Sequence, residues 1–149
     1  MPLIVRQVLV GDKTRWRELY ESYLKFYNSE TIESSIEIVW QRLTKDEPEI
    51  HGLVAELNGE VIGFTHFHYQ LSTWTHTFHC YLEDLYVSEE ERGKGAATAL
   101  IAEVKKLAVA RKCSELFWIT KESNETARKL YDKVANRSDF VRYEISLED

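Results

Sequence analysis

The sequence predicts a mixed α/β fold, with one mostly antiparallel sheet and helices on both faces. Residues 81–87 are rich in aromatic and branched side chains, and apolar residues at helical spacing follow the glycine-containing segment 92–95, so a strand leads through a tight turn into a helix. Asn58-Gly59 separates two apolar runs and predicts a hairpin. A chain of 149 residues suits one core, so we expect a single domain over 1–149.

The first 50 residues are expected to form a strand and two helices. Residues 3–10 read as the strand, and Asp12 is suited to cap the first helix. That helix would carry an aromatic face of Trp16, Leu19, Tyr20, Tyr23 and Tyr27. A second apolar stripe runs through residues 32–43, and its helix must end before Pro48.

The hairpin strands are expected over 53–57 and 61–69, followed by a polar loop over 71–77 that carries Trp74. His66 and His68 alternate onto one face of the second strand. Two such histidines could bind a metal ion, but no third ligand is evident, so we predict no metal site.

The second half of the chain alternates strands and helices. We expect a fourth strand over 78–87, a fifth over 115–120 and a last one over 140–146, with helices after residues 95 and 123. The strand–helix–strand order after residue 80 predicts a right-handed crossover and parallel pairing of the fourth and fifth strands.

The glycine turn before the first of these helices is a candidate anion site. Helix N-terminal amides lack backbone partners and carry the positive end of the helix dipole. Gly93 and Gly95 would let the backbone approach a phosphate closely, while Arg92 and Lys94 add positive charge.

Three segments carry a family resemblance. Arg92-Gly93-Lys94-Gly95-Ala96-Ala97 resembles the Arg/Gln-x-x-Gly-x-Gly/Ala signature of the GNAT N-acetyltransferases. Residues 82–87 (LEDLYV) are similar to the strand before it in polyamine acetyltransferases and in small fungal acetyltransferases of histones or amino acids. Residues 122–133 resemble the family's Asn-x-x-Ala-x-x-Leu-Tyr segment. The resemblance implies the GNAT fold, in which the fourth and fifth strands splay apart.

The resemblance also implies acetyl-coenzyme A as co-substrate. The pyrophosphate would lie on the glycine turn, and the pantetheine arm would lie along the end of the fourth strand and against Asn124. The cofactor-binding residues implied in this way are Leu85, Tyr86, Val87, Arg92, Gly93, Lys94, Gly95, Ala96, Ala97, Asn124 and Tyr131.

By the same resemblance Tyr131 is the acid that protonates the departing thiolate, and Glu83 is the base, acting directly or through water. The implied substrate-binding residues are Tyr27, Glu30, Glu83 and Asp84. Glu83 and Asp84 are neighbours on a strand, so we expect their side chains on opposite faces, with Asp84 free to orient a histidine or a cation. The alternatives are a core tyrosine for Tyr131 and a charge pair at a strand end for the two acids.

The charge of the protein limits the classes of molecule that it is expected to bind. A net charge of −6 and a pI near 5.4 argue against nucleic acid and fit a cationic small amine or basic peptide. No apolar run reaches the ~20 residues that cross a membrane, so we expect a cytoplasmic protein, with the nucleus as the alternative. Cys80 and Cys113 are expected as packed thiols. Family members of this size often dimerise, so the resemblance implies a homodimer.

Two functions are therefore open. The first is an acetyl-coenzyme A dependent N-acetyltransferase for a primary amine, whether a small amine, polyamine, amino acid or basic peptide, by direct attack in a ternary complex. The second is a non-catalytic acyl-coenzyme A binding or sensing module, which would use the same glycine turn without the acid and base.

Overall fold

The computed structural model describes residues 2–29 and 33–148, and the chain divides into two compact units, Met1–Ile119 and Thr120–Asp149. The first unit holds a five-stranded sheet in the order β1-β2-β3-β4-β5. Its strands are β1 (Leu3–Gln7), β2 (His51–Leu57), β3 (Glu60–Gln70), β4 (His79–Val87) and β5 (Glu115–Phe117). All neighbours pair antiparallel except β4 and β5, which pair parallel, so the predicted mixed sheet is confirmed.

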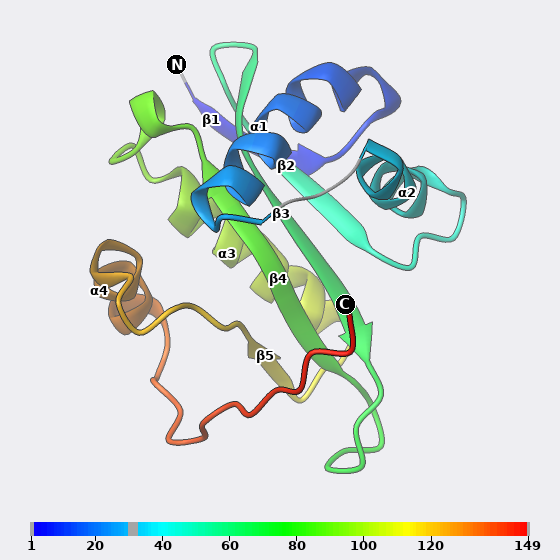
Figure 1. The fold of residues 1–149 in the computed structure, drawn as a ribbon, viewed down its shortest axis with the longest axis vertical. Coiled ribbons are helices and arrows are strands. Elements are labelled where there is room, and N and C mark those ends of the chain that lie inside the picture. The colour runs from blue at the N-terminus through cyan, green and yellow to red at the C-terminus, as the bar shows by residue number, and fades with distance from the viewer. Residues whose placement is uncertain (1, 30–32, 149) are drawn as a thin grey trace. The chain divides into compact units, whose positions relative to one another are not determined.

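Helices cover both faces of this sheet. Helices α1 (Lys13–Phe26) and α2 (Glu33–Thr44) lie on one face, and α3 (Ala96–Ala110) lies on the other (Figure 1). Part of the predicted aromatic stripe of α1 is core: Trp16, Leu19 and Tyr20 are buried, and they join residues of α2 and the sheet in one apolar cluster. Helix α3 buries Leu100, Ile101 and Val104 and also its small residues Ala96 and Ala108, as its helical spacing predicts.

The hairpin between β2 and β3 turns at Asn58 and Gly59. Both residues have positive φ, 54° and 79°, as a type I′ turn requires. The turn signal in the sequence is thus confirmed at the backbone level.

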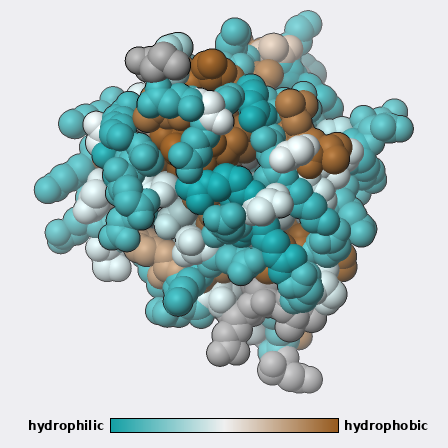
Figure 2. Space-filling model, turned by 90° about the horizontal axis from the view of Figure 1, so that it is seen from above, coloured by the Kyte–Doolittle hydropathy of each residue, from teal (hydrophilic) through white to brown (hydrophobic). Residues whose placement is uncertain are grey.

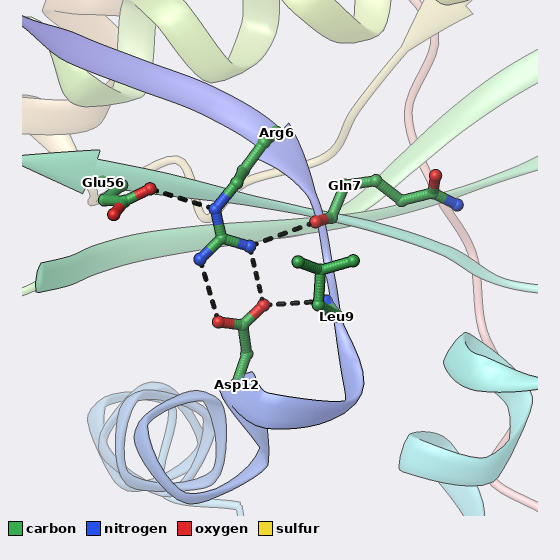
Figure 3. Close-up of polar contacts among 5 residues, drawn as sticks. All are labelled: Arg6, Gln7, Leu9, Asp12 and Glu56. Carbon is green, nitrogen blue, oxygen red and sulfur yellow. Dashed lines mark hydrogen bonds and ion pairs between the residues drawn. The ribbon is translucent and has the colours of Figure 1, made fainter. Parts of the chain in front are cut away.

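Asp12 supports the entry to α1 differently from the prediction. It stands at the N-cap position, but its side chain makes no capping bond to the helix. Its carboxylate accepts the backbone N–H of Leu9 at 2.7 Å and forms two bonds with the guanidinium of Arg6, at 2.8 and 2.9 Å (Figure 3). Arg6 also bonds Glu56 on β2, so this cluster joins β1, β2 and the short 3₁₀ turn Val10–Asp12, which replaces the predicted end of the first strand.

The second unit contains α4 (Glu125–Val134). Residues 135–148 contain no helix or strand, so the predicted last strand over 140–146 is wrong for the chain on its own. A strand requires a partner edge for its backbone N–H and C=O groups, and here the apolar side chains of the segment are highly exposed, from 75% for Phe140 to 92% for Tyr143 and Leu147.

The surface drawn in Figure 2 is mostly hydrophilic, with hydrophobic atoms showing between the polar side chains. Among the described residues, no helix is long and apolar enough to span a bilayer.

Candidate active site

The glycine turn lies between the end of β4 and the start of α3, after the 3₁₀ turn Glu89–Glu91. Gly93 and Gly95 have φ of 83° and 87°, a conformation that favours glycine because other residues meet steric strain there. A Cβ added to either glycine would meet no described residue within 4 Å. Gly95 occupies the N-cap of α3 and no side chain caps it, so the first amides of the helix remain available to an external anion.

The two basic side chains of the turn are engaged within the protein. Arg92 donates through Nε to the carbonyl of Val87 at 3.1 Å, and its guanidinium lies 5.5 Å from the ring centre of Tyr86. Lys94 pairs with Glu91 at 2.6 Å. The helix N-terminus therefore supplies the unshared positive potential at this turn, more than the side chains that the sequence emphasises.

Strand β4 is open along the side that faces β5. The parallel pairing covers only His79–Tyr81 of β4 with Glu115–Phe117 of β5, while the antiparallel pairing with β3 continues to Val87. The backbone of β4 beyond Tyr81 thus has no strand partner on the β5 side within the described residues. This is the splaying of the fourth and fifth strands that the family resemblance implies.

A β-bulge interrupts β4 beside this opening. His66 of β3 pairs with Asp84, but the next residue, Phe67, pairs with Leu82. Glu83 is therefore the extra residue of the bulge. Such a bulge breaks the alternation of side chains and re-aims the residue it contains.

The bulge corrects the expectation that Glu83 and Asp84 point to opposite faces. Asp84 contacts His66 at 2.8 Å, and Glu83 contacts His68 at 3.3 Å. His66 and His68 lie two residues apart on β3 and so share a face. Burial, and after it the negative charges of Asp84 and Glu83, raise the pKa of Tyr20 of α1 to about 12, as expected if both carboxylates approach the α1 face.

The two carboxylates differ in their environment. The side chain of Glu83 is 48% exposed, whereas that of Asp84 is 17% exposed. Asp84 also faces Tyr23 of α1, whose pKa is raised well above its usual range by burial first and then by the charge of Asp84. An accessible carboxylate and a sheltered one thus lie side by side.

His66 connects Asp84 to the core. Its Nδ1 lies 2.8 Å from Asp84 Oδ2, and its Nε2 accepts the indole N–H of Trp16 at 2.9 Å. The expected contact of Asp84 with a histidine is confirmed. Trp16 was missed as a polar partner because it looks like an ordinary core residue and lies 50 positions from His66.

The model of the acetyltransferase (GNAT) family matches residues 16–135, which is most of the chain. The chain belongs to the GNAT family. Its predicted enzyme class, an acetyl-coenzyme A dependent N-acetyltransferase, is confirmed with it.

Relatives and solved structures agree with this assignment. The chain is 29% identical to the D-amino-acid N-acetyltransferase HPA3 of Saccharomyces cerevisiae, over 95% of this chain and 89% of that protein. It is 32% identical to the thialysine N-epsilon-acetyltransferase of Caenorhabditis elegans, over 70% and 66%. It shares its fold with an aminoglycoside N-acetyltransferase in complex with coenzyme A, with a TM-score of 0.81, 19% identity, and 98% and 95% of the two chains covered.

The other GNAT site residues predicted from the sequence fall in three places. Tyr27 is at the C-terminal end of α1, 5.0 Å from Tyr23 between ring centres. Glu30 lies outside the described residues. Asn124 and Tyr131 are in the second unit: Asn124 stands at the N-cap of α4 and donates to Thr120 at 3.3 Å, and Tyr131 is half-buried on the same helix.

The described residues contain no group of three His, Cys, Asp or Glu side chains that could hold a metal ion. The two histidines of β3 each contact a carboxylate instead.

Proposed function

We propose that this GNAT protein transfers the acetyl group of acetyl-coenzyme A to a primary amine of a small molecule or a basic peptide, by direct attack in a ternary complex. One observation carries the proposal: the positive-φ glycine turn at the start of α3 adjoins the end of β4, which beyond Tyr81 has no strand partner on its β5 side within the described residues and which carries two carboxylates. The glycine turn and helix N-terminus suit the pyrophosphate of an acyl carrier, and an acidic side chain can act as the base that removes the proton of the amine.

The cofactor would be held mainly by backbone groups. Amides of residues 93–97 would bind the pyrophosphate, with Arg92 and Lys94 at its margin, and the backbone of residues 85–87 would bind the pantetheine arm. Asn124 would hold the same arm from α4. The bound cofactor supplies the thioester whose acetyl group is transferred.

Glu83 is proposed as the base. A primary amine with a pKa near ~10 is an ammonium at neutral pH and must lose a proton before it can attack. Glu83 is the more exposed of the two carboxylates, and the bulge aims it toward the α1 face. It would accept the proton directly or through water. Tyr131 would then donate a proton to the sulfur that leaves.

The acceptor would bind on the α1 face of β4. Tyr27 and Asp84 are the described residues proposed to contact it, and Glu30 is proposed on sequence grounds alone. Aromatic rings and carboxylates together favour a cationic group. The names of the relatives indicate D-amino acids and thialysine as their substrates, so amino acids belong in any test beside simple amines.

We also propose that the two compact units act as one catalytic domain, which the family match over 16–135 supports because it includes residues of both.

We propose a homodimer, supported by the alternating exposed apolar side chains Val141, Tyr143, Ile145 and Leu147. A cytoplasmic location is proposed because both cysteines are free thiols.

The test is a thiol-release assay with acetyl-coenzyme A and a panel of linear diamines, monoamines, D- and L-amino acids, thialysine and a lysine-containing peptide. We expect coenzyme A release above background with at least one class, and mass spectrometry should show the acetylated amine. Tight binding of coenzyme A without thiol release for any acceptor would contradict the proposal and favour a binding module.

A further inference from the structure

A buried hydrogen-bonded chain leads from the core to the acceptor face. It runs from Trp16 on α1 to His66 on β3 and then to Asp84 on β4, with distances of 2.9 and 2.8 Å. Trp16 is 0% exposed and His66 is 1% exposed. None of the proton transfers assigned above to Glu83 or Tyr131 uses these two hydrogen bonds.

The hydrogen bond from Trp16 determines which ring nitrogen of His66 carries a proton. An indole N–H can only donate, so Nε2 of His66 must be an unprotonated acceptor. The ring then carries its proton on Nδ1 and donates it to Asp84. A doubly protonated ring would set two N–H groups against each other at Trp16, so the arrangement requires a neutral imidazole.

A neutral partner leaves the charge of Asp84 uncompensated. Within the described part of the chain, Asp84 forms no ion pair with a lysine or arginine. The titratable groups facing it are His66 from β3, Tyr20 and Tyr23 from α1, and neighbouring Glu83. A sheltered carboxylate held only by neutral donors is stabilised by a cation that arrives from outside.

We propose that Trp16 and His66 are positioning residues that hold Asp84 as an oriented carboxylate, and that Asp84 binds a second cationic group of the acceptor. The preferred acceptor then carries an ammonium in addition to the amine that is acetylated. The inference rests on the proposed amine acetylation and specifies which amines the site selects.

The tautomer of His66 is measurable without any activity. Long-range ¹H–¹⁵N NMR spectra of the full-length protein at neutral pH, with His66 assigned by its loss in His66→Asn, should show one protonated ring nitrogen, Nδ1. A proton on Nε2, or on both nitrogens, would overturn the positioning role.

Kinetics then test the link to the acceptor. Asn places an amide donor near the position of His Nδ1, whereas Leu places none, and both substitutions remove the imidazole that accepts from Trp16. With a linear diamine, we expect His66→Leu to raise KM at least tenfold and His66→Asn to raise it less than threefold. KM for acetyl-coenzyme A and for the monoamine of equal length should change little in either variant.

A merely structural histidine predicts another pattern. Equal losses in both variants, or equal losses for diamine and monoamine, would overturn the proposal. If His66→Leu does not fold, two wild-type measurements test the proposal. The wild type must prefer the diamine to the monoamine, and His66 must carry its single ring proton on Nδ1; if either result is absent, the proposal is refuted. If the wild type acetylates none of the amines, the proposed function is refuted instead. The binding of the diamine to the wild type and to His66→Asn, measured by calorimetry, would then replace the comparison of KM values.

Discussion

A single extra residue in β4 determines how the acidic side chains of this protein are used. Because Glu83 is the bulge residue, it lies on the same face as Asp84, and the two acids acquire different surroundings. Environments that differ in this way allow neighbouring carboxylates to take separate roles. Glu83 is proposed to remove a proton from the acceptor amine, and Asp84 is proposed to bind a cationic group of the acceptor.

The role of Glu83 predicts the behaviour of Glu83→Gln. The amide keeps the size of the side chain but cannot accept the ammonium proton, and general-base groups contribute about 10²–10⁴-fold. We therefore expect kcat to fall at least 100-fold at neutral pH, with thermal stability unchanged because the side chain is about half exposed. Steady-state kinetics and thermal unfolding check this. A kcat within threefold of the wild type would remove Glu83 from the mechanism.

Tyr131→Phe tests the proposed acid on α4. Loss of the hydroxyl should lower kcat by about 10-fold or more, because the thiolate would leave unprotonated. The dissociation constant for acetyl-coenzyme A, measured by calorimetry, should stay within about twofold. Equal turnover in the two proteins would show that Tyr131 is only a packed side chain.

For the site residues, the sequence could predict the kinds of side chain but not their partners. The run from Glu83 to Val87 and the glycine turn carry local signals. The bulge depends on the register between β3 and β4, and the bond from Trp16 to His66 joins positions 50 apart. Neither follows from a local pattern, because both arise from tertiary packing.

Among the elements, the entry to α1 depends on a charge cluster in place of a simple helix cap. Asp12 holds Arg6 and the Leu9 amide together (Figure 3), and the bond to Arg6, followed by the Leu9 N–H, lowers the pKa of Asp12 although its burial opposes this. Removing one partner of a charge-assisted network costs more than removing an exposed pair.

We expect Asp12→Ala to lower the free energy of unfolding by about 1.5–3 kcal/mol at pH 7, the range for hydrogen bonds to charged groups. Since the folded-state pKa is below the unfolded one, this contribution is present above the unfolded value near ~4 and is lost as pH falls through the folded value. Urea unfolding from pH 7 downward should show the wild type and Asp12→Ala converging in acid.

The matched control for this cluster is Glu49→Ala, which removes the exposed pair with Lys45. Its stability should stay close to that of the wild type across the same pH range, because solvent screens the pair. A wild-type advantage over Asp12→Ala that stays constant into acid would show that the effect comes from packing and not from the charge of Asp12.

The elements of the first unit were largely predictable, because their signals are local. The Asn58-Gly59 turn and the helical spacing of α1 and α3 appear in the structure as expected. Strand β1 ends earlier than predicted because Val10 enters a 3₁₀ turn held by Asp12. The segment over 140–146 alternates like a strand, but alternation cannot supply the neighbouring edge that a strand requires.

For the molecule as a whole, this same segment explains the proposed homodimer. Its odd-numbered residues from Val141 to Leu147 are apolar and highly exposed, while the alternate residues are polar. Such a pattern is suited to pairing with a second copy of the chain, where one face of the new strand would be buried.

Light scattering at micromolar concentration should therefore give twice the chain mass of 17.5 kDa. Ile145→Asp should shift the mass to one chain, because a charge would face the apolar interface. Ser146→Asp, with the same charge on the alternate face, should leave the dimer intact. A wild-type mass of one chain, or equal effects of the two substitutions, would contradict this arrangement.

The proposed function depends on backbone amides at the glycine turn that bind the pyrophosphate of the acyl carrier. It is tested most directly by the affinity of Gly95→Val for acetyl-coenzyme A, measured by calorimetry beside Gly59→Val. Both glycines have positive φ, and a side chain at either position would meet no described residue within 4 Å at its Cβ. Both substitutions therefore carry similar backbone strain, but only Gly95 adjoins the proposed anion site. We predict an affinity loss of tenfold or more for Gly95→Val and less than twofold for Gly59→Val; wild-type affinity in a folded Gly95→Val would contradict the account.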